Sequence, residues 1–318
     1  MEEFTIIRNS LHIDPHLDIW GWEIFVYLFL GGLAAGVMII SAVNGLAGNP
    51  ADEQRSRWSR WAPFLAPVVI SLGMLALFLD LEHKLYVWRF YTAFRVTSPM
   101  SWGAWILIGL YPATILLGLA SLKEDEIKWV GQFAPIRWLK LSGLFKWMCE
   151  FGSKRKTMLL WANFILGMGL GAYTGILLGS LGVARPAWNS AILGPLFLVS
   201  GFSTGAALLM LFPLEHNEHG RLRRWDAWAI TLELALLGLF FIGLASGDGS
   251  DRMALGLFFG GKLTALFWSL VVAAGLIVPL VIEILEGRKG IRPTAFAPVL
   301  LLLGGLSLRW IMVLAGLS

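Results

Sequence analysis

Titratable and aromatic residues cluster where the first apolar segment of this chain begins. His16, Trp20, Glu23 and Tyr27 follow one another at spacings of four, three and four residues. In a helix that starts after Pro15, these spacings place the four side chains along one stripe. A carboxyl group held at the edge of a membrane is a candidate for proton exchange, and the alternative for Glu23 is an interfacial carboxylate solvated by water.

Three further polar side chains lie near the ends of later apolar segments. Asp80 ends the second segment, Tyr173 lies deep in the fourth, and Asn189 stands at the start of the fifth. A tyrosine hydroxyl in apolar surroundings must find a hydrogen-bond partner. Together with His16 and Trp20, these residues supply donors and protonatable groups beside flat apolar walls. A quinone requires such a pocket because its two-electron chemistry also moves two protons, although a transporter cavity would have a similar composition.

Two charged side chains fall inside apolar segments. Glu233 lies near the middle of the sixth, where it acts either as a proton relay or as a structural hydrogen-bonding group. Arg309 lies in the eighth. An unpaired guanidinium is costly there, so a carboxylate or carbonyl partner is expected. With Glu23 and with Asp248, which follows the sixth segment, these residues form a predicted proton pathway.

Eight apolar stretches must position these groups, and each is long enough to cross about 30 Å of hydrocarbon as a helix. They are predicted at Trp20–Val43, Trp61–Asp80, Ser101–Leu122, Met158–Leu181, Trp188–Leu211, Trp225–Ala245, Lys262–Ile284 and Thr294–Leu314. Of all residues, 57% are hydrophobic and only 14% are charged. The chain is therefore predicted to be an all-α integral membrane protein with eight transmembrane helices.

Small residues at i,i+4 spacing recur in the first and fifth stretches, at Gly32 and Gly36 and at Gly201 and Gly205. Such pairs let two helix backbones approach closely. They indicate either helix packing alone or a duplicated unit of four helices. From the second interpretation we predict that the eight helices form two four-helix bundles.

The chain divides into three stretches within a single membrane domain. Residues 1–122 hold an N-terminal extension and three helices, 123–157 form a connection, and 158–318 hold five helices. The spacing of apolar residues in Ile136–Phe151 predicts an amphipathic helix that lies on the cytoplasmic leaflet.

Lysine and arginine are distributed unequally among the gaps. Four alternate gaps, at 45–60, 123–157, 212–224 and 285–293, hold 17 of the 25. Because cytoplasmic loops are the basic ones, we expect these gaps inside, and both termini and the polar site outside, in the periplasm if the host has two membranes. The predicted location is the cytoplasmic (inner) membrane. Basic residues in short flanking loops serve topology and lipid contact, so no nucleic-acid partner is expected.

The chain lacks the ligands of common redox centres. Its single cysteine, Cys149, cannot hold an iron–sulfur cluster, and no histidine lies near the middle of a predicted span, where paired haem ligands would be needed. His216 and His219 have i,i+3 spacing, but they lie in a polar stretch where solvated side chains are favoured over a metal site.

Four segments carry a resemblance to a known family. They are WGWEIFVYLFLGGLAAG at 20–36, RVTSPMSWGAW at 95–105, AYTGILL at 172–178 and RPAWN at 185–189. Their combination resembles the NrfD-type membrane subunits, the family of the polysulfide reductase membrane anchor. The resemblance implies a haem-free subunit that binds menaquinone or ubiquinone and pairs with a ferredoxin-like iron–sulfur subunit, itself often attached to a molybdopterin-containing catalytic subunit.

The resemblance also assigns residues. The quinone-contacting positions map to His16 and Tyr173, and less directly to Asp80 and Asn189. The connection at 123–157 is longer than expected of the shortest family members. It lies opposite the predicted site, so this departure concerns the arrangement of partners more than quinone binding.

The resulting hypothesis is a membrane subunit of a respiratory oxidoreductase that is not catalytic alone. It exchanges electrons between the quinone pool and an iron–sulfur subunit on the outer face, with proton translocation as a possible accompaniment. The alternatives are a secondary transporter or ion channel, and a passive membrane anchor of a redox complex.

Overall fold

The computed structural model describes residues 21–47, 56–81, 83–92, 94–132, 142–180, 186–188, 191–289 and 294–317. Within these ranges every regular element is a helix, and eight helical spans are long and apolar enough to cross a membrane. The predicted all-α membrane fold is therefore confirmed. Backbone inside hydrocarbon must satisfy its own hydrogen bonds, which is why apolar sequence of this length folds as continuous helix.

Short helices connect the long ones. The spans are α1 (Trp22–Leu46), α2 (Arg57–Trp61) continued by η2 (Ala62–Phe64) and α3 (Leu65–Asp80), α5 (Pro99–Ser121), α9 (Lys156–Ser180), α10 (Leu193–Met210), α11 (His216–Ser246), α13 (Thr264–Leu266) continued by η6 (Phe267–Ile277) and α14 (Val278–Lys289), and α15 (Phe296–Leu317). The connecting elements are η3 (Lys84–Tyr86), α4 (Arg89–Thr92), α6 (Glu124–Gly131), α8 (Ser142–Lys154), η5 (Pro186–Trp188) and α12 (Gly249–Phe258).

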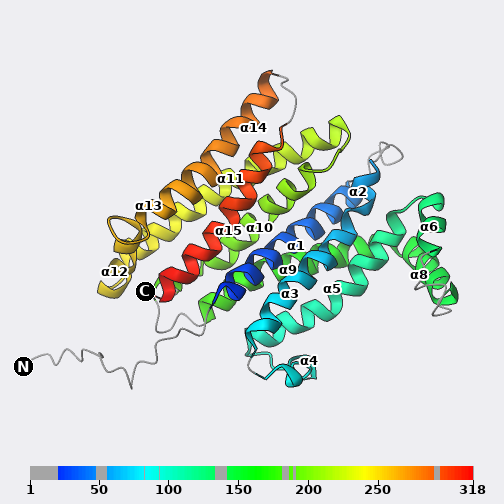
Figure 1. The fold of residues 1–318 in the computed structure, drawn as a ribbon, viewed down its shortest axis with the longest axis horizontal. Helices are drawn as coiled ribbons and strands as arrows, with labels where there is room; N and C mark the ends of the chain where they lie inside the picture. Colours follow the sequence, from blue (N-terminus) through cyan, green and yellow to red (C-terminus); the bar gives the residue numbers. More distant parts are fainter. Residues whose placement is uncertain are drawn as a thin grey trace, which may run out of the picture.

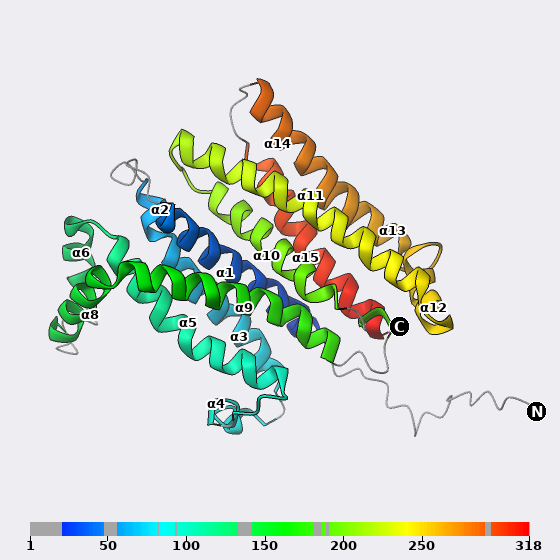
Figure 2. The same cartoon turned by 180° about the vertical axis from the view of Figure 1, so that it is seen from behind.

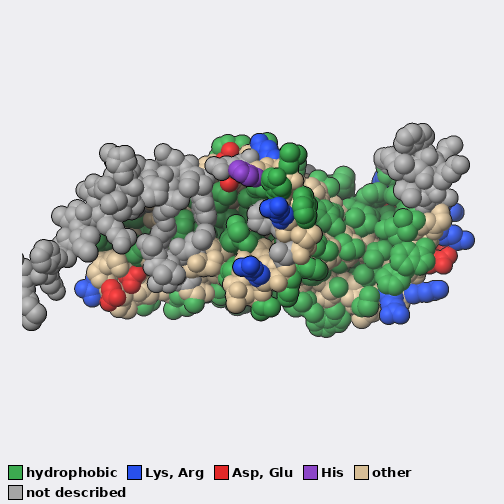
Figure 3. Space-filling model, turned by 90° about the horizontal axis from the view of Figure 1, so that it is seen from below, with side chains coloured by type: hydrophobic (Ala, Val, Ile, Leu, Met, Phe, Trp, Pro, Cys, Tyr) green, Lys and Arg blue, Asp and Glu red, His purple; other side chains and the backbone are tan. Residues whose placement is uncertain are grey.

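The long helices lie side by side, so the connecting elements gather at two opposite ends (Figure 1 and Figure 2). One end carries α2, α6, α8 and the turn between α10 and α11, and we call it the basic end. The other carries α4, α12 and the C-terminus, and we call it the α4 end. The described parts of the four gaps rich in Lys and Arg thus lie together. Figure 3 shows a largely hydrophobic surface leading to the basic end, whose tip bears Lys and Arg side chains.

Helix α1 lies at the centre and contacts α3, α9, α10 and α15. Gly36 of α1 lies against Gly201 and Gly205 of α10, so closely that a side chain at any of the three would overlap the opposing backbone. The packing interpretation of these glycines is confirmed. The duplication and the division into two four-helix bundles stay predictions.

The sixth span begins earlier than the sequence predicted. Helix α11 starts at His216 rather than at Trp225, so the prediction of a loop over 212–224 was wrong from His216 onward. The cause is a reciprocal cap, in which the side chains of Glu215 and Glu218 each accept a hydrogen bond from the other's backbone N–H. This cap begins a helix whose first turns are polar and lie outside the apolar stretch.

The connection at 123–157 contains two short helices in its described part. Helix α8 covers the later part of the predicted amphipathic helix and packs against α5, while Leu144 and Trp147 are exposed. Residues 133–141, where that helix was predicted to begin, lie outside the described residues.

Glu126 attaches this connection to α2. The Arg60 guanidinium donates two hydrogen bonds to its carboxylate, from Nε at 3.0 Å and from Nη2 at 2.9 Å. Partial burial alone would raise the pKa of Glu126, but the Arg60 hydrogen bonds and charge, together with the backbone N–H of Lys123, lower that pKa to about 2. The pair is therefore ionised at neutral pH.

Candidate functional site

An apolar cavity of about 100 Å³, the tyrosine cavity, lies between α1, α3, α5 and α9 near the α4 end. Its polar groups come from Tyr27, Tyr91 and Tyr173. The rest of the lining is hydrophobic or glycine, namely Met74, Leu77, Phe78, Leu81, Val87, Met100, Gly103, Ala104 and Leu107. Phe78 is 37% exposed and Met100 is 51% exposed. The lining thus extends to the lipid-facing surface of the bundle.

Tyr27 and Tyr173 bring α1 and α9 together inside the cavity. Both rings are buried, and the two hydroxyls hydrogen-bond to each other. Helix α5 approaches the Tyr173 ring directly, because Gly103 has no side chain and a Cβ there would overlap the ring. A phenol can donate one hydrogen bond and accept others, so this pair can also bind a carbonyl oxygen.

The segment after α3 closes one side of the cavity. Leu81 at the end of α3, Val87 after η3 and Tyr91 of α4 all line it. The segment thus lies against the mouth of the bundle. Burial raises the pKa of the Tyr91 hydroxyl, and the neighbouring Tyr111 raises it further, so Tyr91 stays protonated at neutral pH.

Glu23 and Asp80 lie beside the tyrosine cavity rather than in its wall. Glu23 is in the first turn of α1 and Asp80 is the last residue of α3, and their charges are close enough to interact. Two carboxyl groups therefore stand together at the membrane border. The other predicted quinone contacts, His16, Trp20 and Asn189, lie outside the described residues.

Arg309 and Glu233 meet deep in the protein, and both are almost completely buried. The guanidinium donates to Ser200 Oγ at 2.6 Å, to the Gly305 carbonyl at 3.0 Å and to the Phe197 carbonyl at 3.2 Å. Ser200 also hydrogen-bonds to Glu233, whose charge is close to that of Arg309. The expected carboxylate and carbonyl partners of Arg309 are thus confirmed.

Asp248, the fourth residue of the predicted proton pathway, lies elsewhere. It is exposed and caps α12, with its side chain accepting the backbone N–H of Asp251 while its own N–H donates to Asp251 Oδ2 at 3.1 Å. Its described contacts are those of a helix cap.

Sequence reasoning passed over several buried groups. Tyr27 was in the first stripe but not among the predicted quinone contacts, although its place four residues after Glu23 was a signal. Asp226 and Glu283 were also missed, and the signal was a carboxyl group inside each of two apolar segments. These two carboxyls lie close to each other between α11 and α14, and their charges interact. Among the residues that the structure describes, no group of three or more His, Cys, Asp or Glu is arranged to hold a metal ion.

Comparison with known proteins bears on this arrangement. A family model described as "Polysulphide reductase, NrfD" matches residues 11–318. The chain belongs to the NrfD family. It is 32% identical to Protein NrfD of Escherichia coli over 94% of this chain and 95% of that protein. It is 30% identical to a polysulfide reductase chain of Wolinella succinogenes over 94% of each protein, and 25% identical to a selenate reductase subunit of Mesobacillus selenatarsenatis over 93% of this chain and 73% of that one.

The NrfD match confirms the resemblance seen in the sequence. The NrfD family includes membrane subunits of polysulfide and selenate reductase complexes, and this chain is a multi-pass membrane protein of that family. Its place in the family is consistent with a membrane anchor of a redox complex.

Proposed function

We propose that this chain is the quinone-reactive membrane subunit of a respiratory reductase complex. The observation that supports this most directly is an apolar cavity with two hydrogen-bonded tyrosines whose lining extends to the lipid-facing surface. A quinone is a lipid-soluble ring with two carbonyl oxygens, so it would enter from the bilayer and need donors at only a few points.

The residues present fit such a ring. The cavity of about 100 Å³ is smaller than the apolar cavity of about 150 Å³ that holds benzene, so a quinone ring would extend beyond it through the side that opens toward lipid. Tyr27 and Tyr173 would bind one carbonyl oxygen, and Tyr91, which stays protonated, would donate a further hydrogen bond. Bound quinone, menaquinone or ubiquinone, supplies two-electron redox chemistry that is coupled to two protons. Glu23 and Asp80 stand close enough to the cavity to exchange those protons with water at the border.

We further infer how the chain is oriented and what it assembles with. The basic end faces the cytoplasm, because Lys and Arg favour that side. The tyrosine cavity then lies near the outer face, where an iron–sulfur subunit would dock and pass electrons to or from it. Two relatives are each named as one component of a reductase, which supports a complex with several polypeptides, including a catalytic subunit. His16, Trp20 and Asn189 belong to the same proposed site through the sequence resemblance.

Proton translocation is the second part of the proposal. Buried charged or acidic groups, among them Asp226, Glu233, Glu283 and Arg309, lie within the membrane-spanning helices. Ionisable groups in such positions are costly and are usually kept for function. Glu233 would hold and release a proton as the quinone chemistry proceeds, with Arg309, which stays protonated, as its charge partner.

The test is Tyr173→Phe and Tyr27→Phe in the purified complex, with the exposed Tyr86→Phe as control. Loss of one hydrogen bond of about 1 kcal/mol predicts that each cavity variant weakens quinone binding about fivefold, and the control is unchanged. Quinone retained after purification and quinol turnover are measured together. Unaltered binding and turnover in both cavity variants, with the complex intact, contradict the proposed site. A protein that purifies alone and without quinone supports a transporter instead.

A further inference from the structure

The buried face of α11 carries three carboxyl groups in a row. Glu218, Asp226 and Glu233 are only 8%, 0% and 2% exposed. They are eight and seven residues apart, which is close to two turns, so they share one face and are separated by about 12 Å and about 10 Å along the axis. The row runs from the basic end, where α11 begins, toward the middle of the span.

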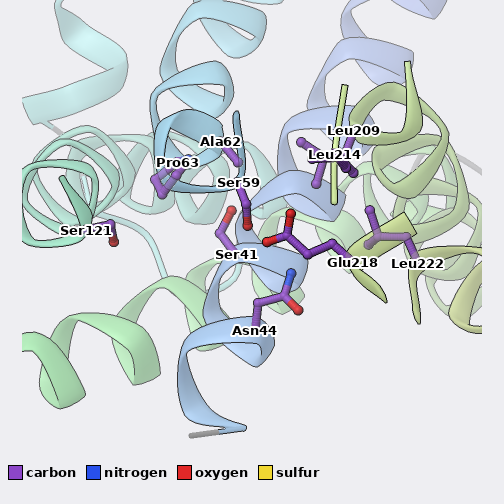
Figure 4. Close-up of a pocket in the computed structure, with 10 residues that line it drawn as sticks. All are labelled: Ser41, Asn44, Ser59, Ala62, Pro63, Ser121, Leu209, Leu214, Glu218 and Leu222. Carbon is purple, nitrogen blue, oxygen red and sulfur yellow. The ribbon is translucent and has the colours of Figure 1, made fainter. Parts of the chain in front are cut away.

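A second, polar cavity of about 20 Å³, the Glu218 cavity, lies where this row begins (Figure 4). Its lining comes from α1, α2, η2, α5, α10, α11 and the turn before α11, and its polar side chains are Ser41, Asn44, Ser59, Ser121 and Glu218. In Figure 4 the Glu218 carboxylate points into the space between Ser41, Ser59 and Asn44.

The two oxygens of Glu218 differ in their partners. Oε2 accepts the backbone N–H of Ser56 at 3.4 Å and that of Glu215 at 3.3 Å. Oε1 is buried and has no hydrogen-bond partner among the described residues, and the same is true of Ser41 Oγ. A buried polar atom without a partner is unfavourable, and a cavity of this size with several polar walls is large enough for one water molecule. Water at this place would bond to both oxygens.

The next carboxyl, Asp226, continues the row from two sides. Ser203 of α10 donates to its Oδ1 at 2.6 Å, and the Glu283 carboxyl of α14 lies close to it. Two carboxyl groups in contact inside the protein cannot both be ionised, so the pair holds a proton between them. The charged neighbours of Glu283 are Glu286 on its own helix and Arg223 on α11.

The last carboxyl connects the row to α1. Ser200 accepts from Arg309 and hydrogen-bonds to Glu233, so it bridges the two charges. The Arg309 Nη2 lies 3.1 Å from the position that a Cβ on Gly32 would take. Gly32 is five residues from Tyr27, about 7.5 Å along the same helix. The row thus ends beside the helix that contributes a tyrosine to the tyrosine cavity.

Helix packing alone does not explain these buried carboxyls, because even with Arg309 close to Glu233 and Arg223 close to Glu283 the Asp226–Glu283 pair has to hold a proton. We propose that the carboxyl face of α11, entered at the Glu218 cavity, conducts protons between water at the basic end and the centre of the protein. This inference rests on the proposed quinone chemistry, which makes proton movement useful. A proton from water binds Glu218, passes through water to the Asp226–Glu283 pair, and from there to Glu233. The gaps of about 12 Å and about 10 Å exceed one hydrogen bond, so water must bridge both.

The test uses the intact complex in liposomes that contain a pH-sensitive dye, with quinone-linked turnover started from outside. Glu218→Gln removes the titrating group, and Glu124→Gln, exposed on α6 at the same end, is the control. We expect Glu218→Gln to slow proton movement at least tenfold and Glu124→Gln to leave it unchanged. Quinone retained by each purified complex is measured separately, so a failure of quinone binding is distinguished from a failure of the path.

Ser41→Val provides a second variant in case Glu218→Gln impairs assembly. It replaces a hydroxyl without a described partner by apolar groups that fill the cavity and exclude water, so proton movement should slow in the assembled complex while Glu218 itself is kept. Wild-type proton movement in Ser41→Val, or in an assembled Glu218→Gln complex, overturns the proposal. It is also overturned if turnover moves sodium ions rather than protons in the wild type.

Discussion

Replacing Arg309 by methionine removes the one guanidinium that the described part of the chain buries completely. The side chain donates three hydrogen bonds and lies close to the charge of Glu233. Methionine has a similar length and no charge, so the substitution leaves packing largely intact. The substitution leaves the buried Glu233 carboxylate without its cation, so Glu233 must either stay charged in apolar surroundings or take up a proton.

The loss of stability depends on whether the lost hydrogen bonds or the unpaired Glu233 charge contributes more. Two of the three bonds, to Ser200 and Phe197, reach another helix, and interhelical hydrogen bonds in membranes average about 0.6 kcal/mol. Their loss alone predicts about 1 kcal/mol. Removing one partner of a buried ion pair typically costs about 3–5 kcal/mol. The stranded charge therefore dominates, and we expect Arg309→Met to lower the free energy of unfolding by about 3–5 kcal/mol.

The assay is reversible unfolding in mixed detergent micelles of Arg309→Met, Glu233→Gln and the double variant. Because the double variant strands no charge, we expect it to be more stable than Arg309→Met by about 2 kcal/mol. Equal stability of these two proteins, or a double variant that shows the sum of the single effects, would refute the reasoning, since Arg309 would then not compensate Glu233.

Two further predictions concern other contacts. In Gly103→Ala the new methyl group displaces the Tyr173 ring, so this variant should weaken quinone binding about tenfold. In Gly109→Ala, on the same helix, the new methyl group makes only ordinary van der Waals contact, so this control should bind quinone normally. Equal quinone binding by the two variants would show that the Tyr173 ring is free to move. The stabilisation from Glu126 and Arg60 is complete above the ordinary carboxyl pKa of 4.5 and is lost as pH falls toward about 2. Between pH 5 and about pH 3 the thermal unfolding midpoint should thus fall more in the wild type than in Glu126→Gln. The control variant Glu124→Gln should behave as the wild type. Parallel curves of unfolding midpoint against pH for all three proteins would contradict this.

The number of membrane-spanning helices could be predicted, but some boundaries could not. Apolar length revealed each span because hydrocarbon forces the backbone to bond internally. The start of α11 was missed because its first turns are polar and are held by the cap between Glu215 and Glu218. Hydropathy is insensitive to such a continuation of a helix beyond the membrane.

The candidate site was predicted less completely than the fold. Tyr173 and Asp80 were predicted to belong to one pocket, and the tyrosine cavity includes Tyr173 and Leu81, the residue after Asp80. Tyr27 was not chosen, and the partners of Asp226 were not foreseen. Spans that are apolar all round do not reveal their inward face by periodicity, since lipid accepts the same side chains as the protein interior.

By itself, the sequence determined that the chain spans a membrane eight times, that its basic loops share one side and that it resembles the NrfD family. These follow from lengths, charges and motifs that are local along the chain. Only the tertiary structure decided that Tyr27 bonds to Tyr173, that Asp226 meets Glu283 and that Glu218 borders a cavity. Each of these contacts joins side chains from different parts of the chain, and helix packing through small residues such as Gly36 and Gly201 determines which of them meet.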